Sequence, residues 1–107
     1  MRVELLREAV TELHHARLWY EDQRTGLGDE FFHEALDTFA RIGEAPEAYP
    51  RWPGTDRFEF IVRKAPVRRF PYRIAFEMRT DRVVIVAVAH GKRRPLYWVD
   101  RQGRRPA

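Results

Sequence analysis

The longest apolar stretch of the sequence, residues 83 to 89, constrains the fold more than any other feature. It reads Val-Val-Ile-Val-Ala-Val-Ala, so an extended strand here would have apolar side chains on both faces. Such a strand is buried on both sides, as happens in the centre of a covered sheet. A membrane helix would need about 20 apolar residues, far more than this run provides. The pattern therefore predicts a central strand over residues 82 to 89, covered on both faces.

Two further strand patterns precede this run, at residues 58 to 64 and 72 to 78. In the second pattern apolar residues alternate with Arg73, Ala75 and Glu77, which predicts one buried face and one wetter face. Arg73 should therefore point away from the core. Thr80 and Asp81 are typical of a hairpin turn leading into the central strand.

The first half of the chain predicts a short strand at residues 1 to 6 and then two helices. In the first helix the apolar stripe is formed by Ala9, Leu13, Ala16 and Tyr20, widened by Val10 and Trp19. Gly26-Leu27-Gly28 should end this helix, and we expect Asp29 to cap the next one. The second helix has a wide apolar face, formed by Phe31, Phe32, Ala35, Leu36, Phe39 and Ile42.

These patterns together predict an α+β fold with two layers. An N-terminal strand and an antiparallel helix hairpin would pack on a small, mainly antiparallel sheet of about four strands. The 107 residues fit a single domain. We expect a basic, flexible tail from about residue 100 to the end of the chain.

Charge is distributed unevenly along the chain. Residues 1 to 50 contain five Arg or Lys and eleven Asp or Glu, whereas residues 51 to 107 contain fifteen and five. Eighteen of the twenty basic residues are arginine, whose planar fork suits phosphate and carboxylate. The second half is therefore expected to contact an acidic or polyanionic partner. An arginine-rich genome composition would give the same ratio, but it does not account for the segregation.

Several classes of site are excluded by composition. The chain has no cysteine and no serine, which removes disulfides, thiol nucleophiles and a Ser-His-Asp triad. His14 and His15 would point about 100° apart on a helix, and His33 has no spaced partner. We therefore expect no metal and no cofactor. The start of the chain lacks a signal peptide pattern, so we expect a cytoplasmic protein that does not contact membranes.

His90, at the end of the central strand, is the best single candidate for acid–base chemistry. The alternative is a strand-end histidine that is hydrogen-bonded to a neighbouring loop. Around it the sequence interleaves basic residues with aromatic ones, a pattern typical of RNA-contacting surfaces. The last of these rings, Trp98, is better explained as a cover for the open face of the sheet.

Four segments stand out in their order along the chain: Trp19-Tyr20-Glu21, Gly26-Leu27-Gly28-Asp29-Glu30-Phe31, Arg69-Phe70-Pro71-Tyr72-Arg73-Ile74 and Ala89-His90-Gly91-Lys92-Arg93-Arg94-Pro95. With the order strand, helix hairpin and three strands, they resemble the RelE/ParE superfamily of type II toxins, from Val3 to about Arg101. The resemblance implies a compact toxin held inactive by an antitoxin encoded beside it. The antitoxin would wrap the toxin and bury its helices or its sheet.

One branch of this superfamily, the RelE-like toxins, binds the ribosome and cleaves mRNA with basic residues and often a tyrosine or histidine. Four positions match places where these members keep functional residues: Lys64, Arg73, Arg93 and Tyr97. The match is incomplete, because Pro66 stands where a second lysine would be expected. Arg94 also competes with Arg93 for the same role.

The nuclease hypothesis gives four catalytic candidates: Arg73, His90, Arg93 and Tyr97. The two arginines would hold the scissile phosphate, and His90 or Tyr97 would lie near the proton that moves. Six further basic residues would bind nucleic acid or a partner: Lys64, Arg68, Arg69, Lys92, Arg94 and Arg101.

ParE-like members instead inhibit DNA gyrase and need no nuclease residues. Under this hypothesis the protein would be a binding toxin and not an enzyme. A third alternative is a non-toxic member that only pairs with its antitoxin. The implied partners are therefore a cognate antitoxin and, as target, either the ribosome with its mRNA or DNA gyrase.

Overall fold

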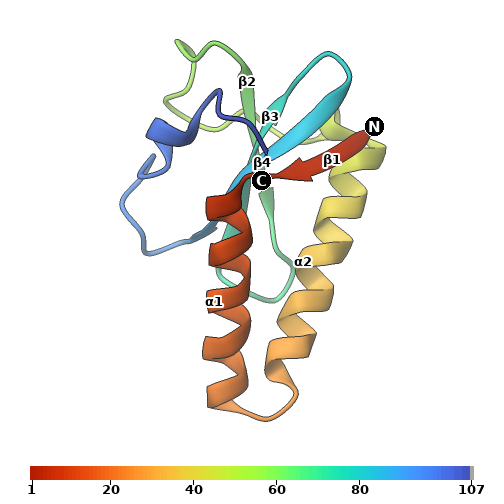
Figure 1. Cartoon of the computed structure of the whole chain (residues 1–107), viewed down its shortest axis with the longest axis vertical. Coiled ribbons are helices and arrows are strands. Elements are labelled where there is room, and N and C mark those ends of the chain that lie inside the picture. Colours follow the sequence, from red (N-terminus) through yellow and green to blue (C-terminus); the bar gives the residue numbers. More distant parts are fainter. Residues whose placement is uncertain (107) are drawn as a thin grey trace.

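A four-stranded sheet with a helix hairpin on one face forms the frame of the protein (Figure 1). The computed structural model describes residues 1–106. In chain order the elements are β1 (Arg2–Leu5), α1 (Arg7–Gln23), α2 (Leu27–Glu44), the 3₁₀ helix η1 (Pro46–Ala48), β2 (Ile61–Pro66), β3 (Tyr72–Met78), β4 (Arg82–His90) and the 3₁₀ helix η2 (Val99–Arg101). This is the predicted α+β fold.

The strand order is β1-β4-β3-β2, with β1 parallel to β4 and the other neighbours antiparallel. β4 lies between β1 and β3, and every residue from Val83 to Ala89 is buried. Separate apolar clusters contact its two faces. The prediction of a central strand that is covered on both sides is therefore confirmed.

The helix hairpin covers the first face of the sheet. Its core contains the predicted stripe of α1 and, from α2, Phe31, Ala35, Phe39 and Ile42. The rings pack closely, since the centroid of Phe31 lies 5.2 Å from that of Tyr20 and 5.2 Å from that of Phe70. Burial of these aromatic side chains is the main source of stability on this face.

The start of α2 differs from the prediction, because Asp29 is not its N-cap. The helix begins at Leu27, and Gly26 precedes it with φ of 90°, a conformation that favours glycine. The free amides of Gly26 and Gly28 donate to the carboxylate of Glu21 on α1, at 3.0 and 3.1 Å. Asp29 instead pairs with Arg17 at 2.6 Å. A residue from the preceding helix thus takes the capping role that local sequence assigns to Asp29.

The predicted strand at residues 58 to 64 is displaced, because β2 begins at Ile61 and ends at Pro66. Ile61 pairs with Met78, the last residue of β3, so no partner is available for an earlier start. Phe58 instead closes a turn by donating its amide to Thr55 O at 3.1 Å.

The prediction of a wetter face on β3 was wrong. Ala75 and Glu77 point to the second face of the sheet and are 0% exposed. This face is covered by Trp98, whose ring contacts Trp52 and Phe58 with centroid distances of 5.1 and 6.3 Å. The interpretation of Trp98 as a cover is therefore confirmed. The alternation of residues along β3 could not reveal this cover, because it comes from a segment that follows β4.

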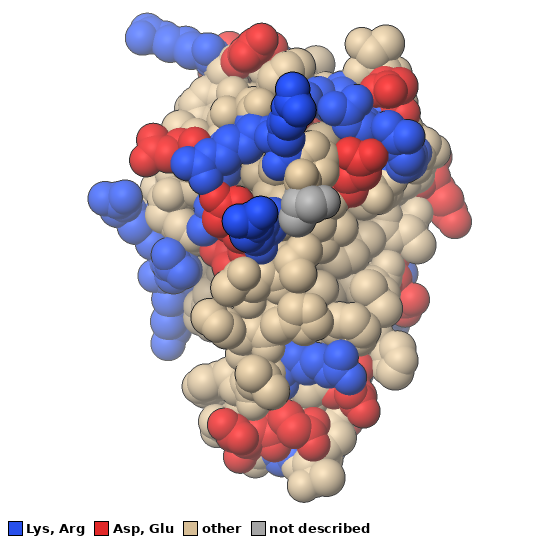
Figure 2. Space-filling model, in the orientation of Figure 1, with Lys and Arg blue, Asp and Glu red and all other residues tan. Residues whose placement is uncertain are grey.

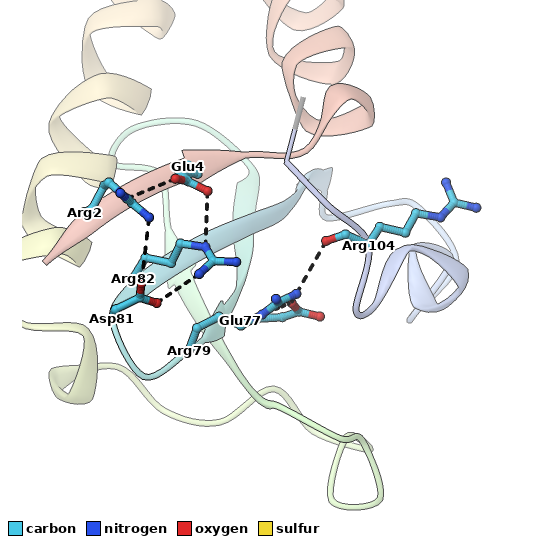
Figure 3. A network of polar contacts seen from close by, with 7 residues as sticks. All are labelled: Arg2, Glu4, Glu77, Arg79, Asp81, Arg82 and Arg104. Atoms are coloured by element: carbon cyan, nitrogen blue, oxygen red, sulfur yellow. Dashed lines mark hydrogen bonds and ion pairs between the residues drawn. The ribbon is translucent and has the colours of Figure 1, made fainter.

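The described part of the predicted tail, residues 100 to 106, contacts the body of the protein. Gly103 donates its amide to the buried carboxylate of Glu77 at 2.7 Å, and Arg104 forms an ion pair with Glu8 on α1. Figure 3 shows Arg79 between Glu77, at 2.7 Å, and the carbonyl of Arg104. We expect these contacts to restrict the motion of the tail, so that it becomes flexible only when they are lost.

Replacing Trp98 tests the importance of the second core. Because this ring is 1% exposed, Trp98→Ala should lower the free energy of unfolding by about 3 to 5 kcal/mol. Trp19→Ala is the matched control, since that ring is 57% exposed and its loss should cost under about 1 kcal/mol. Urea unfolding followed by circular dichroism measures both. Equal losses would contradict the assignment of Trp98 to a core.

Candidate functional site

The carboxylate of Glu12 joins α1, β4 and the C-terminal segment. β1 ends at Leu5, and the last backbone hydrogen bond from this segment to β4 is donated by the amide of Leu6 to Ile85 O at 3.0 Å. Beyond it, Val88 donates its amide to Glu12 Oε1 at 3.0 Å. Arg101 binds the same oxygen at 2.8 Å and also donates to Val86 O at 3.3 Å. Side chains therefore satisfy backbone groups that a longer β1 would otherwise bind.

Tyr97 completes this network and is fixed by it. Its hydroxyl donates to Glu12 Oε2 at 2.5 Å. Burial, followed by this hydrogen bond and the negative charge of Glu12, raises the pKa of Tyr97 well above its ordinary value of 10.0. The phenol therefore stays protonated at neutral pH, and its one proton is already donated to a carboxylate.

Six of the predicted site residues line one cleft on the second face of the sheet, with a volume of about 340 Å³. They come from β2, from β3 and from the end of β4 with the segment that follows it: Lys64, Arg73, His90, Arg93, Arg94 and Tyr97. We call this the cationic cleft. Arg73 is half-buried on the face opposite the helices, beside the second core, and its Nη1 donates to Tyr72 O at 3.2 Å.

Aromatic rings support two of the cations in the cationic cleft. The guanidinium of Arg93 lies 3.8 Å from the ring centroid of Tyr97, and the ammonium of Lys64 lies 5.7 Å from that of Trp52. Both contacts are cation–π interactions. Within residues 1–106, Lys64, Arg73, Arg93 and Arg94 form no ion pair with a carboxylate. The arrangement is suited to an anionic ligand.

His90 is hydrogen-bonded to the loop that follows β4. Its Nδ1 accepts the amide proton of Lys92 at 3.0 Å, and its ring meets that of Tyr72 edge to face at 5.0 Å. When Nδ1 accepts, the neutral imidazole carries its own proton on Nε2. This contact matches the alternative reading of His90 as a strand-end histidine bound to a neighbouring loop.

A second cleft, of about 590 Å³, adjoins the first and was missed by sequence reasoning. It lies between α1 and the ends of β3 and β4 and is lined by Glu12, His15, Ala16, Trp19, Tyr20, Pro71, Tyr72, Val88, His90 and Arg93. We call it the aromatic cleft. Trp19 was predicted to widen the buried stripe of α1, but its ring is 57% exposed. Its position next to Tyr20, about 100° around the helix, is the signal that could have indicated exposure.

The remaining predicted binding residues lie outside the cationic cleft. Arg69 pairs with Glu30 at 2.8 Å and Arg101 with Glu12, whereas Arg68 and Lys92 are exposed. Figure 2 shows basic side chains spread mainly over the upper half of the molecule, around the sheet and the C-terminal segment. Among residues 1–106, no group of three or more metal-ligating side chains is arranged to hold a metal ion. None of the helices in this described part is long and apolar enough to cross a membrane.

The raised pKa of Tyr97 predicts a loss of stability in alkali. A group with a raised folded-state pKa stabilises the fold below its unfolded pKa, and this contribution is lost as pH rises through the folded value. Above about pH 10, each tyrosine that ionises only on unfolding lowers stability by about 1.4 kcal/mol per pH unit. Burial also raises the pKa of Tyr20 and Tyr72. Tyr97→Phe should make this slope shallower in urea unfolding series from neutral to alkaline pH; an unchanged slope would contradict the raised pKa of Tyr97.

Comparisons with known proteins agree with this architecture. Residues 3–95 match the family described as ParE toxin of type II toxin–antitoxin system, parDE. The fold is similar to a solved structure from P. aeruginosa, described as its chromosomal ParDE TA system, with a TM-score of 0.69 and 14% sequence identity over 84% of this chain and 95% of that chain. A comparison with curated proteins gives no match. The resemblance to the RelE/ParE superfamily is thus confirmed, and the chain belongs to the ParE toxin family of type II toxin–antitoxin systems.

Proposed function

We propose that this protein is the growth-inhibiting toxin of a toxin–antitoxin pair and that it inhibits DNA gyrase by binding, without cleaving RNA. Membership of the ParE toxin family supports the toxin role. The resemblance described above implies gyrase as the target of ParE-like members. Because gyrase acts on chromosomal DNA, the proposal also places the protein in the cytoplasm.

The observation that carries the choice of binding over cleavage is the state of the two proton-transfer candidates. The hydroxyl of Tyr97 donates to Glu12, and its raised pKa keeps it from acting as a base at neutral pH. His90 Nδ1 already accepts the amide of Lys92, which leaves Nε2 of the neutral ring as a donor. The arginines nearby remain charged and hold anions without moving protons.

A second candidate function, ribosome-dependent mRNA cleavage, is favoured by one specific observation. All four predicted catalytic residues, Arg73, His90, Arg93 and Tyr97, line the cationic cleft. Arginines in such a position could stabilise charge on a phosphate during cleavage. This candidate requires Tyr97 or His90 to leave its present hydrogen bond on the ribosome.

A cognate antitoxin is the proposed neutralising partner, and the structure favours the helix hairpin as its binding surface. The outer edge of β2 is occupied, because Trp52 donates its amide to Val62 O at 2.8 Å and Pro50 O accepts from Lys64 at 2.9 Å. The part of β4 that extends beyond β1 is bound by the side chains of Glu12 and Arg101. Strand addition at these two edges is therefore disfavoured. The hairpin exposes large apolar side chains that a partner helix could cover: Leu18, Trp19 and Leu36.

The first experiment separates the two targets with one preparation of the purified chain. We expect inhibition of gyrase supercoiling and intact mRNA in a purified translation mixture, because neither Tyr97 nor His90 is placed to accept a proton from the substrate. Cleavage of mRNA that needs ribosomes, with supercoiling unaffected, would contradict the proposal and support the second candidate. A preparation that stops growth but affects neither reaction would also contradict it.

Tyr97→Phe provides an independent test within the same site. A nuclease that uses this hydroxyl should lose about 10²-fold to 10⁴-fold in cleavage rate. A binding toxin should keep its inhibition, with unfolding free energy lowered by about 1 to 3 kcal/mol because Glu12 loses a donor. Growth inhibition and urea unfolding are measured on the same variant. Loss of toxicity in a variant with near-normal stability would contradict the proposal that the protein acts by binding without cleaving RNA.

A further inference from the structure

The aromatic cleft lies on the helix-covered side of the sheet, between α1 and the ends of β3 and β4. Three rings line it, those of Trp19, Tyr20 and Tyr72. The ring of Tyr20 meets that of Trp19 edge to face at 5.1 Å and that of Tyr72 at 6.2 Å. Because Trp19 is 57% exposed, folding leaves much of its apolar surface uncovered. With its volume of about 590 Å³, the cleft has room for a large side chain of a partner.

The polar groups in the lining of the aromatic cleft favour an anion beside this apolar surface. Arg93 forms no ion pair with a carboxylate among residues 1–106. His90 Nδ1 accepts a backbone amide, which leaves the proton on Nε2 for an external acceptor. Glu12, the one carboxylate in the lining, is paired with Arg101 at 2.8 Å. Its charge is compensated, so it opposes an incoming anion only weakly.

A protein segment suits the aromatic cleft better than a strand of nucleic acid does. Arg93 is the one Arg or Lys among the described residues that line it, whereas a strand presents a phosphate at every nucleotide and needs cations along its path. One guanidinium and one imidazole donor match a single carboxylate. The adjacent rings match a large apolar side chain. The ligand that fits is therefore an Asp or Glu next to an aromatic or large aliphatic residue.

Trp19 connects this cleft to the hairpin surface that is assigned above to the antitoxin. Leu18 and Trp19 are neighbours on α1, about 100° apart around the helix, and both are exposed. An antitoxin helix that covers both side chains takes the exposed ring away from the cleft. A target that needs the same ring is then excluded while the antitoxin is bound.

We propose that the protein holds gyrase through the aromatic cleft. An acidic gyrase segment places a large apolar side chain against Trp19 and the neighbouring carboxylate against Arg93. The antitoxin neutralises the toxin by covering Trp19, so that gyrase and antitoxin exclude each other. This inference rests on the proposed function.

Binding to gyrase holoenzyme, measured together with supercoiling inhibition, tests the assigned surface. Trp19→Ala and Arg93→Ala should each weaken binding by more than about fivefold, the loss expected for side chains at the centre of an interface. Leu18→Ala and Arg24→Ala are the matched controls and should change it by under about twofold. Leu18 is 64% exposed on the same helix, and Arg24 is already paired with Glu30. Urea unfolding checks that all four variants are folded.

The same variants separate the two partners. Trp19→Ala and Leu18→Ala should each weaken binding of the purified cognate antitoxin by more than about fivefold, whereas Arg93→Ala should leave it within about twofold. Adding the antitoxin to the wild-type protein should abolish gyrase binding. Simultaneous binding of antitoxin and gyrase would overturn the assigned overlap.

A photo-crosslinker identifies the segment that occupies the cleft. His15→benzoylphenylalanine places a reactive group in the lining and keeps both Trp19 and Arg93. On irradiation with gyrase and DNA it should attach to a gyrase peptide that contains Asp or Glu beside an aromatic or large aliphatic residue. Attachment to DNA, or to a gyrase peptide without such a pair, would overturn the inference.

Failure of this inference is distinguishable from failure of the proposed function. Gyrase inhibition by the wild-type protein, with unchanged binding by Trp19→Ala and Arg93→Ala, would overturn the assigned surface and leave the proposed function standing. Absence of gyrase binding and inhibition in the wild-type protein would overturn both.

Discussion

The carboxylate of Glu12 is the interaction on which the arrangement of the site depends. β1 has four residues and β4 has nine, so the parallel pairing ends halfway along the central strand. Backbone groups beyond this point would be buried without partners, which costs free energy comparable to a lost hydrogen bond. Glu12 and Arg101 supply the partners and neutralise each other. The same carboxylate fixes Tyr97, whose ring contacts the guanidinium of Arg93. The side chain that binds the free backbone groups of β4 therefore also positions a cation of the cationic cleft.

The second face of the sheet shows how a chain with only one helix layer buries a strand that is apolar on both sides. The C-terminal segment provides the cover through Trp98, and Gly103 is held by the buried carboxylate of Glu77. Part of this cover lies beyond residues 3–95, the range that matches the toxin family. The cationic cleft forms where the cover meets the ends of the strands. Its shape therefore depends on a segment that the family match does not include.

The sequence predicted the parts of this fold that local patterns encode. The apolar run of β4, the periodic faces of α1 and α2 and the alternation of β3 all correspond to elements of the structure. The errors have a common physical cause, since each involves a partner that lies in another element or segment of the fold. Glu21 replaces Asp29 as the cap of α2, and Trp98 covers the face that β3 alone would leave wet.

The candidate site divides in the same way. The cationic residues could be named because composition and resemblance both indicate them. Their convergence in one cleft requires the pairing of Arg73 with Ala89, which a single sequence does not specify. The commitment of Tyr97 to Glu12, a residue 85 positions away, could not be anticipated. The exposure of Trp19 could not be anticipated either. The apolar stripe of a helix has no sharp boundary in the sequence, and the elements that pack against the helix decide which of its residues are buried.

In the folded protein, part of the opposite charge on the two halves of the chain is paired in ion pairs between them. Of the ten ion pairs among residues 1–106, five join the acidic half to the basic half, including Glu8 with Arg104 and Glu30 with Arg69. Three of these pairs hold the C-terminal segment and the loop before β3 against the helices, and the other two hold β1 against the start of β4. The exposed pairs among them each contribute about 1 kcal/mol or less. The charge available to a partner is the fraction that folding leaves without carboxylates, and Lys64, Arg73, Arg93 and Arg94 of the cationic cleft belong to this fraction.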